Sequence, residues 1–485
     1  MAIEEPKQKI NRAIGAIAAG SFLQNLAVMA ILLALPTIAD DLNTSIFVIV
    51  WVIFGYSLMG QSLTVPMGKL GDIYGRKLIY VLGLTIAGSA AALSAISVDV
   101  YQLIGFRFLA GFGAAMSLGT SSAQIVAIAP DRTRGRSIGV LTSSVMIGVL
   151  LGPVIGGLIV TYTSWRALFG LIALIEIPLI LSAILFIPKV KPSSETSRKF
   201  DKKGAFLFSS IISSLLLGFT TIGNPSIPVG FSYIMLTLSP VFIVLFVLAE
   251  KNKEAPLLDL KLFRILRYGG GIAVAFPAAM ALHSLPFTMV FFLQSVRNIS
   301  PTDTAIVLVF LTGVQLFGLA GGWLSDRIGS AIPMASGLSL YMIGFLTLYL
   351  RAPDASIPEF MLLMVIVGVG AVIFATPMTS MVLGALPKRS LGVGSGLLAS
   401  LRFVGGLVAQ AIVIAILGLV LGQAGEISSV LGGARILDQA LGTQAIQYVF
   451  LASMTYSAVA LSITLLLIKK GIGKKVSGST EGKEG

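Results

Sequence analysis

Apolar stretches long enough to cross a membrane recur along the whole chain, separated by short polar segments. A helix needs about 20 apolar residues to span the hydrocarbon layer. Charged residues interrupt three of the stretches, at Arg107, Glu176 and Arg402. We therefore expect fourteen membrane-spanning helices, at roughly 13–38, 46–68, 78–97, 102–128, 137–161, 166–187, 203–224, 228–249, 268–294, 303–325, 331–351, 358–383, 392–420 and 445–468.

The seventh and eighth of these spans rest on one uncharged stretch. No charged residue lies between Lys203 and Glu250, and Asn224-Pro225-Ser226 in its middle is a turn signal. The stretch is long enough for a hairpin of two crossing helices. The alternative is a chain of twelve spans with this hairpin lying on the membrane surface; the length of the stretch favours fourteen.

The composition excludes most other protein classes. Hydrophobic residues make up 56% of the chain and charged residues only 11%, whereas an ordinary globular chain is about a quarter charged. Such a chain cannot cover a water-facing surface, which argues against a soluble enzyme, a disordered scaffold and a nucleic-acid binder. With no cysteine, no phosphate-binding loop of the G-x-x-x-x-G-K-[ST] type and no cluster of metal ligands, we expect no enzyme activity, no cofactor and no metal.

The basic residues indicate the orientation in the membrane. Most of the 34 lysines and arginines lie in the N-terminal segment, the even-numbered connections and the tail, and only Arg166, Arg297, Arg351 and Arg435 fall on the opposite side. Because cytoplasmic loops are enriched in Lys and Arg, we expect both termini in the cytoplasm. The net charge of +13 is then a topology signal and an attraction to anionic lipid, not to nucleic acid.

A repeated motif suggests that the chain contains two copies of a six-helix unit. Residues 68–75 and 322–329 both fit G-x-L-x-D-x-x-G, at the ends of the second and tenth spans. Two parallel repeats can form a site at the midplane that alternates between the membrane faces. We expect an N-terminal six-helix bundle (1–190), a linker with two additional helices (191–265), a C-terminal six-helix bundle (266–470) and a disordered cytoplasmic tail (471–485).

Several motifs together resemble a known family. They are the two repeated loops, the first continued by Arg76-Lys77; the fourth-span run 107–115; the fifth-span run Gly148-x-x-x-Gly152-Pro153-x-x-Gly156-Gly157; and Leu35-Pro36-Thr37-Ile38-Ala39, Trp165-Arg166, residues 256–260 and Gly394-Ser395-Gly396 followed by Arg402. The chain resembles the major facilitator superfamily, in its fourteen-helix drug:proton antiporter branch. The resemblance implies an all-α integral membrane fold of two pseudo-symmetric six-helix bundles plus an inserted hairpin, and alternating-access transport across the cell membrane.

The loop motifs are candidates for a gate on the cytoplasmic side. Glycines allow a helix to end and turn tightly, so that the carboxylates of Asp72 and Asp326 can meet a helix N-terminus or an arginine. Such a contact would latch the two halves together; the alternative is a static clasp of the loop that only stabilises the fold. The candidate partners are Arg76, Arg134 and Arg327.

The fifth-span motif has a backbone function. Pro153 removes an amide donor and bends the helix, while Gly152, Gly156 and Gly157 leave a smooth stripe that another helix can approach closely. We expect a dry, sliding contact between the two halves; ordinary helix packing is the alternative. The resemblance associates this motif with antiport.

Buried ionisable groups are the candidates for proton coupling, because such groups are costly within a span. Glu176 lies near mid-depth in the sixth span and could take up and release protons, or it could be paired permanently with Arg107. The resemblance ties Arg107 to proton coupling. His283, the only histidine, could carry protons or simply pack by a hydrogen bond. Arg402 could contact the substrate or hold the gate.

The first span departs from the family pattern. Many members carry an acidic residue where this chain has Ala27, and the neutral Gln24 and Asn25 lie nearby. Asp40 and Asp41 follow this span on the outer side and could receive protons. The candidate substrate-binding residues are Gln24, Asn25, Phe22, Phe287, Gln294 and Arg402.

These observations predict a monomeric secondary transporter that exports amphipathic or drug-like compounds in exchange for protons. Its partners would be the small-molecule substrate, protons and the lipid bilayer. The alternatives are an uptake symporter or facilitator for a nutrient, a transporter of a lipid-like substrate, and a receptor on the same fold.

Overall fold

The computed structural model describes residues 7–130, 133–189, 201–222, 227–251, 253, 263–386, 391–423 and 439–472, and this part of the chain is helical without strands. The turn at Asn224, the motif at 256–260 and the expected disordered tail from residue 473 onwards lie outside the described residues. The helices are α1 (Lys7–Asp41), α2 (Ile46–Ile49), α3 (Trp51–Tyr74), α4 (Arg76–Ala95), α5 (Val100–Ile128), α6 (Arg134–Tyr162), α7 (Trp165–Phe186), α8 (Lys202–Thr221), α9 (Val229–Glu250), α10 (Leu266–Phe291), η3 (Phe292–Val296), α11 (Pro301–Val314), η4 (Gln315–Phe317), α12 (Gly318–Ile328), α13 (Ala331–Arg351), α14 (Ile357–Gly384), α15 (Leu391–Gln423) and α17 (Gln439–Lys469).

Thirteen helices in the described part are long and apolar enough to cross a membrane. They match thirteen of the fourteen expected spans. The expected span 303–325 is different, because a short 3₁₀ segment, η4, separates α11 from α12. Glycines at 313, 318, 321 and 322 surround this segment, and glycine weakens a continuous helix because it gains conformational freedom when the helix opens.

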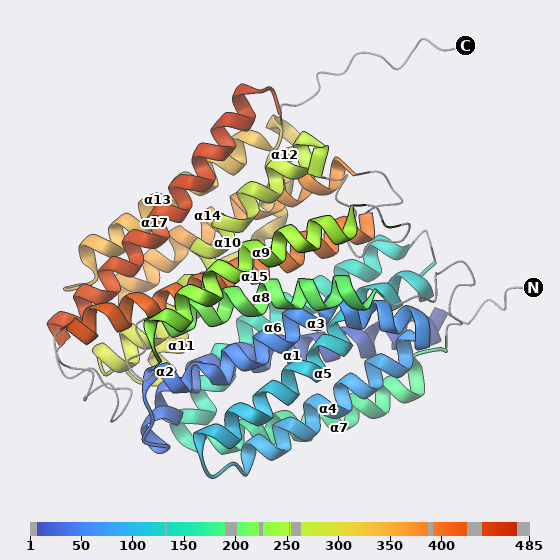
Figure 1. Cartoon of the computed structure of the whole chain (residues 1–485), viewed down its shortest axis with the longest axis horizontal. Helices are drawn as coiled ribbons and strands as arrows, with labels where there is room; N and C mark the ends of the chain where they lie inside the picture. Colours follow the sequence, from blue (N-terminus) through green and yellow to red (C-terminus); the bar gives the residue numbers. More distant parts are fainter. Residues whose placement is uncertain are drawn as a thin grey trace, which may run out of the picture.

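The helices form two groups that follow the chain order (Figure 1). Helices α1 and α3–α7 pack on one another, and helices α10–α17 form the second group. We call these groups the N-half and the C-half. Helices α8 and α9 pair as a hairpin, and α8 contacts both α3 of the N-half and α15 of the C-half. The hydroxyl of Ser209 on α8 donates to the carbonyl of Ser62 on α3 at 2.9 Å.

The repeated motif ends α3 and α12 in the same way. The last glycine of each copy, Gly75 and Gly329, has a positive φ of 106° and 83°. Side chains other than glycine rarely adopt this left-handed region. The motif therefore supplies an abrupt helix end at the corresponding place in both halves.

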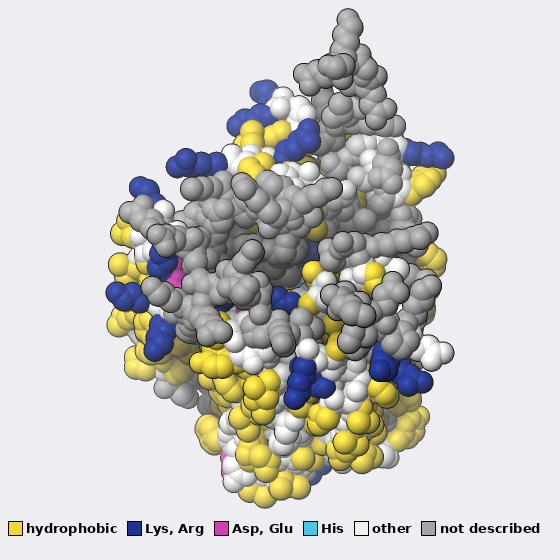
Figure 2. Space-filling model, turned by 90° about the vertical axis from the view of Figure 1, so that its right-hand side faces the viewer, with side chains coloured by type: hydrophobic (Ala, Val, Ile, Leu, Met, Phe, Trp, Pro, Cys, Tyr) yellow, Lys and Arg dark blue, Asp and Glu magenta, His cyan; other side chains and the backbone are white. Residues whose placement is uncertain are grey.

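Helix α1 begins and helix α17 ends away from the left-hand end of Figure 1, where α2 and α11 lie. Figure 2 looks onto the right-hand side of the molecule, where lysine and arginine side chains are spread over the surface and few acidic side chains are visible. This distribution is the one expected of a cytoplasmic face. We call the opposite face the outer face.

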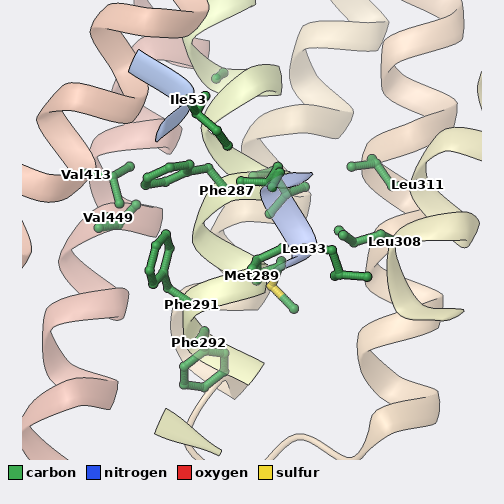
Figure 3. Packing of buried hydrophobic residues seen from close by; sticks show 14 of the residues in the cluster. Leu33, Ile53, Phe287, Met289, Phe291, Phe292, Leu308, Leu311, Val413 and Val449 are labelled. Atoms are coloured by element: carbon green, nitrogen blue, oxygen red, sulfur yellow. The ribbon is translucent and has the colours of Figure 1, made fainter. Parts of the chain in front are cut away.

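The largest apolar cluster joins the two halves toward the outer face. Figure 3 shows Leu33 of α1 and Ile53 of α3 beside Phe287 and Met289 of α10, with Leu308 of α11 next to Leu33. Their side chains are at most 4% exposed. Large apolar residues elsewhere point outward, as on α9 with Leu248 at 63% exposure, because lipid rather than water surrounds the chain.

Candidate functional site

Arg107 is buried within the N-half without a carboxylate partner among the described residues. Its side chain is 4% exposed, and its Nε donates to the carbonyl of Val52 on α3 at 3.1 Å. The guanidinium carbon lies 4.5 Å from the ring centre of Tyr56 and 5.8 Å from that of Phe169. These two aromatic faces stabilise the cation in place of an acid. Tyr56 is a site residue that the sequence pattern did not reveal, because an aromatic residue in an apolar span gives no distinct signal.

Glu176 is the buried acid of the N-half. It lies on α7 with 3% exposure, pressed against α4 so closely that a β-carbon added to Gly88 would come within 2.9 Å of its Cβ. Its Oε2 atom has no hydrogen-bond partner among the described residues. The ion pairs of the described residues do not join Glu176 to Arg107, so the structure does not contain the permanent pair considered as an alternative.

The position of Glu176 separates it from the contact between the halves. Helices α4 and α7 lie at the edge of the N-half that is remote from the C-half (Figure 1). Tyr56 of α3 and Phe169 of α7 both lie beside the Arg107 guanidinium group. Phe169 is two turns before Glu176 on the same helix. The acid and the cation therefore belong to one set of packed helices, α3, α4, α5 and α7.

The polar residues of α1 face the interior of the same half. The Gln24 side chain donates to the Ser117 hydroxyl on α5 at 2.6 Å, and its Oε1 has no partner among the described residues. Asn25 instead donates to the carbonyl of Ser21 on its own helix at 2.8 Å. Phe22 packs its backbone carbonyl against Gly148. Of these three candidates, Gln24 has a free acceptor directed into the N-half.

Phe287 and Gln294, expected to line a binding pocket, lie in the closed contact between the halves. Phe287 stacks on Phe54 of the N-half at 6.1 Å between ring centres and is 0% exposed. Gln294, in the π-helical turn η3, donates to the carbonyl of Leu33 on α1 at 3.1 Å. These residues therefore close the outer side in this conformation. A substrate role for them remains a prediction for a different conformation.

A second outer contact joins α6 to α11. The Thr302 hydroxyl donates to the Gly157 carbonyl at 3.3 Å and to the Thr161 hydroxyl at 2.9 Å. Together with Gln294 and Phe287, these are the hydrogen bonds and ring contacts that join the two halves in the described part of the chain. All of them lie toward the outer face, so the structure is closed on the outer side.

The expectation that the whole glycine motif forms a contact between the halves is wrong. A β-carbon on Gly152 would meet Met29 and the carbonyl of Leu26, and one on Gly156 would meet Ala30, all on α1 of the same half. Pro153 is also buried on this helix. The glycines are spaced so that most of the stripe faces α1, because four-residue spacing keeps them on one side of α6.

Gly157 alone of the motif faces the C-half. A β-carbon there would lie 3.0 Å from both Ala305 Cβ and the Pro301 carbonyl oxygen of α11. It is the next residue after Gly156 and so points about 100° around the helix from it.

The carboxylate of Asp72 pairs within the N-half. Arg76 Nε lies 2.8 Å from Asp72 Oδ1, and its Nη1 donates to the Ala123 carbonyl of α5 at 2.8 Å. Arg327 stacks on Trp323 at 4.0 Å within α12. The side chains of Asp326 and Arg134 lie outside the described residues. In this conformation Asp72 therefore holds α3 to α4 and α5 rather than to the C-half.

Asp41 has a structural partner at the outer end of the N-half. Its Oδ2 accepts from Arg166 at 2.7 Å and from the Trp165 indole at 2.9 Å. Arg166 also donates to the Ser97 carbonyl at 3.4 Å. The Trp-Arg pair thus fastens the outer end of α1 to α4 and α7. Asp40 is exposed beside it, and proton uptake by either carboxylate remains a prediction.

The C-half places its partly buried His283 and Arg402 on α10 and α15. His283 is held by a contact of its Nδ1 with the Ala279 carbonyl at 3.0 Å, one turn back on α10. Gly406 on α15 leaves room for it, since a β-carbon there would come within 2.9 Å of His283 Cβ. Arg402 lies one turn from Gly406 on the same helix and is partly buried. Metal-binding groups of His, Cys, Asp and Glu do not occur in the described part.

The sequence matches the model of the Major Facilitator Superfamily over residues 17–410. The chain belongs to this superfamily. It is a multi-pass integral protein of the cell membrane and a transporter of small molecules rather than an enzyme.

Its relatives within the superfamily are mainly transporters named for drugs and antibiotics. The chain is 28% identical over 388 residues to the riboflavin transporter RibZ of Clostridioides difficile (strain 630), covering 80% of this chain and 83% of that protein. It is 29% identical over 406 residues to the multidrug resistance protein Stp of Mycobacterium tuberculosis (strain CDC 1551 / Oshkosh), covering 81% and 73%. It is 26% identical over 385 residues to the multidrug efflux pump LfrA of Mycolicibacterium smegmatis (strain ATCC 700084 / mc(2)155), covering 78% and 75%.

Solved structures of transporters share the fold at low sequence identity. The crystal structure of a bacterial homologue of the human lysosomal transporter Spinster, in an inward-facing and unoccupied conformation, superposes with a TM-score of 0.68 at 14% identity, covering 98% of this chain and all of that one. The human organic anion transporter MFSD10 superposes with a TM-score of 0.58 at 18% identity, covering 93% and 100%. The superfamily fold is thereby established for this chain.

Proposed function

We propose that this transporter exports amphipathic small molecules in exchange for protons, as a monomer of the fourteen-helix drug:proton antiporter branch. The observation that carries the proposal is the buried Glu176, whose Oε2 atom has no hydrogen-bond partner among the described residues. It lies in the same half as Arg107, a buried cation without a described carboxylate partner. An ionised carboxylate without a partner is costly in apolar surroundings. Taking up a proton removes that cost, so the group is suited to bind and release protons.

The coupling step follows from the contacts of Arg107 with the neighbouring helices. Arg107 of α5 is bound to the Val52 carbonyl of α3 and stacked on Tyr56 of the same helix. A movement of α3 and α5 relative to α7 would therefore change the distance from the cation to Glu176. A nearer cation favours the ionised carboxylate and a more distant one favours the protonated form. Opening and closing of the N-half would then change the affinity of Glu176 for a proton.

The direction of transport is inferred from the relatives. The names of several of them refer to resistance, efflux or export. The described structure is closed on the outer side by the contacts of Gln294, Phe287 and Thr302, and in this conformation an exporter would accept its substrate from the inner side. The relative named as a riboflavin transporter supports a second candidate, the transport of a neutral heterocyclic nutrient without export.

Proteoliposomes containing a pH-sensitive dye test the proposal. A proton gradient is imposed, and ethidium, fluorescein and riboflavin are added in turn to vesicles whose orientation has been determined by protease accessibility. We expect one compound at least to cause proton movement opposite to its own. In Glu176→Gln this movement should fall to the rate of empty vesicles, because the amide cannot carry a proton.

Asp354→Asn is the matched control, since Asp354 is an exposed acid on the outer face and its loss should leave the proton signal unchanged. Substrate movement without a proton signal in the wild type would contradict antiport. A full proton signal in Glu176→Gln would remove Glu176 from the coupling mechanism.

A further inference from the structure

Arg402 is a cation inside the C-half whose guanidinium group has no acidic partner among the described residues. It lies on α15, on the side that faces α10, since the neighbouring Gly405 and Gly406 pack on Phe276, Ala279 and His283 of that helix. The hydrogen bonds and ion pairs among the described residues do not include its guanidinium group. A guanidinium group within a membrane protein normally pairs with an acid or with backbone carbonyls.

The described acidic side chains of the C-half lie away from Arg402. Asp303 and Glu359 are in the first turns of α11 and α14, and Asp354 is in the connection between α13 and α14 on the outer side. Glu176 lies in the other half. Among the described residues, the interior of the C-half therefore carries an excess of positive charge.

A free acceptor lies on the same face of α15. Gln410 is two turns from Arg402, and its Oε1 atom is buried without a hydrogen-bond partner in the described part of the chain. Residues at four-residue spacing share one face of a helix, so Arg402, Gly406 and Gln410 form a line along α15. Gly406, between the two polar groups, packs closely against His283 of α10.

These observations indicate that the transported compound carries a negative charge. A cationic compound would be repelled by Arg402 and would find no described acid in the C-half. An anionic group can instead form a bidentate, charge-assisted pair with a guanidinium group. A hydroxyl or amide donor on the same molecule could reach the free oxygen of Gln410.

We propose that the transported compound is an amphipathic anion whose carboxylate, sulfonate or phosphate group binds Arg402. This inference rests on the proposed function only in assuming that an amphipathic compound enters the interior; it requires neither proton coupling nor export. The apolar part of the anion contacts the lining of α10 and α15, and the partly buried position of Arg402 keeps the guanidinium accessible to the compound.

Two dyes with the same ring system and opposite charge provide the test. Fluorescein is an anion at pH 8 and rhodamine 123 is a cation, and their binding to the purified protein in nanodiscs can be followed by fluorescence anisotropy. The variants are Arg402→Met, which keeps the length of the side chain without its charge, and Arg402→Lys. The matched control is Arg267→Met, which removes an exposed charge at the cytoplasmic end of α10.

We expect wild-type protein to bind fluorescein more tightly than rhodamine 123, and Arg402→Met to bind fluorescein about tenfold or more weakly, because a charge-assisted hydrogen bond is lost. Arg402→Lys should lie in between, and Arg267→Met should resemble the wild type. Tighter binding of rhodamine 123, absence of saturable fluorescein binding, or unchanged fluorescein binding by Arg402→Met would overturn the proposal.

The lipid of the nanodisc distinguishes two sources of the anionic group. Discs of phosphatidylcholine alone are compared with discs that also contain phosphatidylglycerol. Weaker fluorescein binding in the second type, abolished by Arg402→Met, would identify a lipid headgroup as the anion, and equal binding would identify a free solute. The proton-flux assay tests the proposed function separately. Arg402-dependent fluorescein binding without proton movement would support the anion site and contradict antiport. Proton-coupled transport that is insensitive to Arg402→Met would support antiport and contradict the anion site.

Discussion

Gly157→Ala should shift the balance between the outer-closed conformation and its outer-open counterpart. The added methyl group would lie 3.0 Å from Ala305 Cβ, 3.0 Å from the Pro301 carbonyl oxygen and 3.1 Å from Leu33 Cδ2. These distances are shorter than ordinary van der Waals contact, so α6 and α11 must separate by a few tenths of an ångström. Overpacking of this kind destabilises the outer-closed conformation by at least about 1 kcal/mol. A change of this size alters the ratio of outer-closed to outer-open molecules about fivefold.

Gly156→Ala is the matched variant because its methyl group crowds α1 instead. It would lie 2.7 Å from Ala30 Cα, within the N-half, and this contact is present whichever way the two halves are arranged. We expect it to lower the unfolding temperature without changing the conformational ratio. Gly139→Ala on the same helix meets nothing within 4 Å and should change neither.

Distance measurements between spin labels can read the ratio directly. The chain contains no cysteine, so Val98→Cys and Asp354→Cys, both exposed on the outer face, can be labelled without a background signal. In Gly157→Ala the population at the longer distance should rise about fivefold over that of the wild type. An unchanged distance distribution, or an equal change in Gly139→Ala, would refute the assignment of Gly157 to the outer closure.

Two further variants test the cytoplasmic ends of the helices. Burial opposes ionisation of Asp201, but hydrogen bonds from Lys253 and from the Gly204 amide outweigh it and lower the pKa of Asp201 below its ordinary value of 3.8. A lowered pKa contributes stability above that value and loses it as the pH falls through the folded-state pKa. Asp201→Asn should therefore lower the unfolding temperature at pH 7 by roughly 1–2 °C, since a partly exposed pair contributes at most about 1 kcal/mol. The difference in unfolding temperature between variant and wild type should shrink below about pH 4. A difference that does not change with pH would argue against the ion pair. Asp72→Asn removes the carboxylate that holds Arg76; if it acts as a latch, the transport rate should fall about tenfold with the unfolding temperature unchanged, whereas full transport at normal expression would leave only a static clasp.

Membrane insertion, helix number and charge asymmetry are determined by local composition. A stretch of about 20 apolar residues is stable across a bilayer wherever it occurs in the chain, and the basic residues that flank it set its direction. The sequence therefore predicted fourteen spans, of which thirteen match continuous helices of the described part, and the repeat at Gly75 and Gly329 predicted matching helix ends in both halves. The break at Gln315–Phe317 was missed because hydropathy does not record a change in helical pitch.

The partners of each polar or glycine residue were decided by the tertiary structure. The spacing of Gly152, Gly156 and Gly157 shows that a helix can approach α6 closely, but not which helix; three-dimensional packing assigns the first two to α1 and the third to α11. Likewise, Glu176 and Arg107 are costly charges in any membrane span. Only the arrangement of α3, α4, α5 and α7 places aromatic rings beside Arg107 and leaves Glu176 without a partner. The cost of burial is a property of each residue, whereas its compensation depends on neighbours that the chain brings together from distant positions.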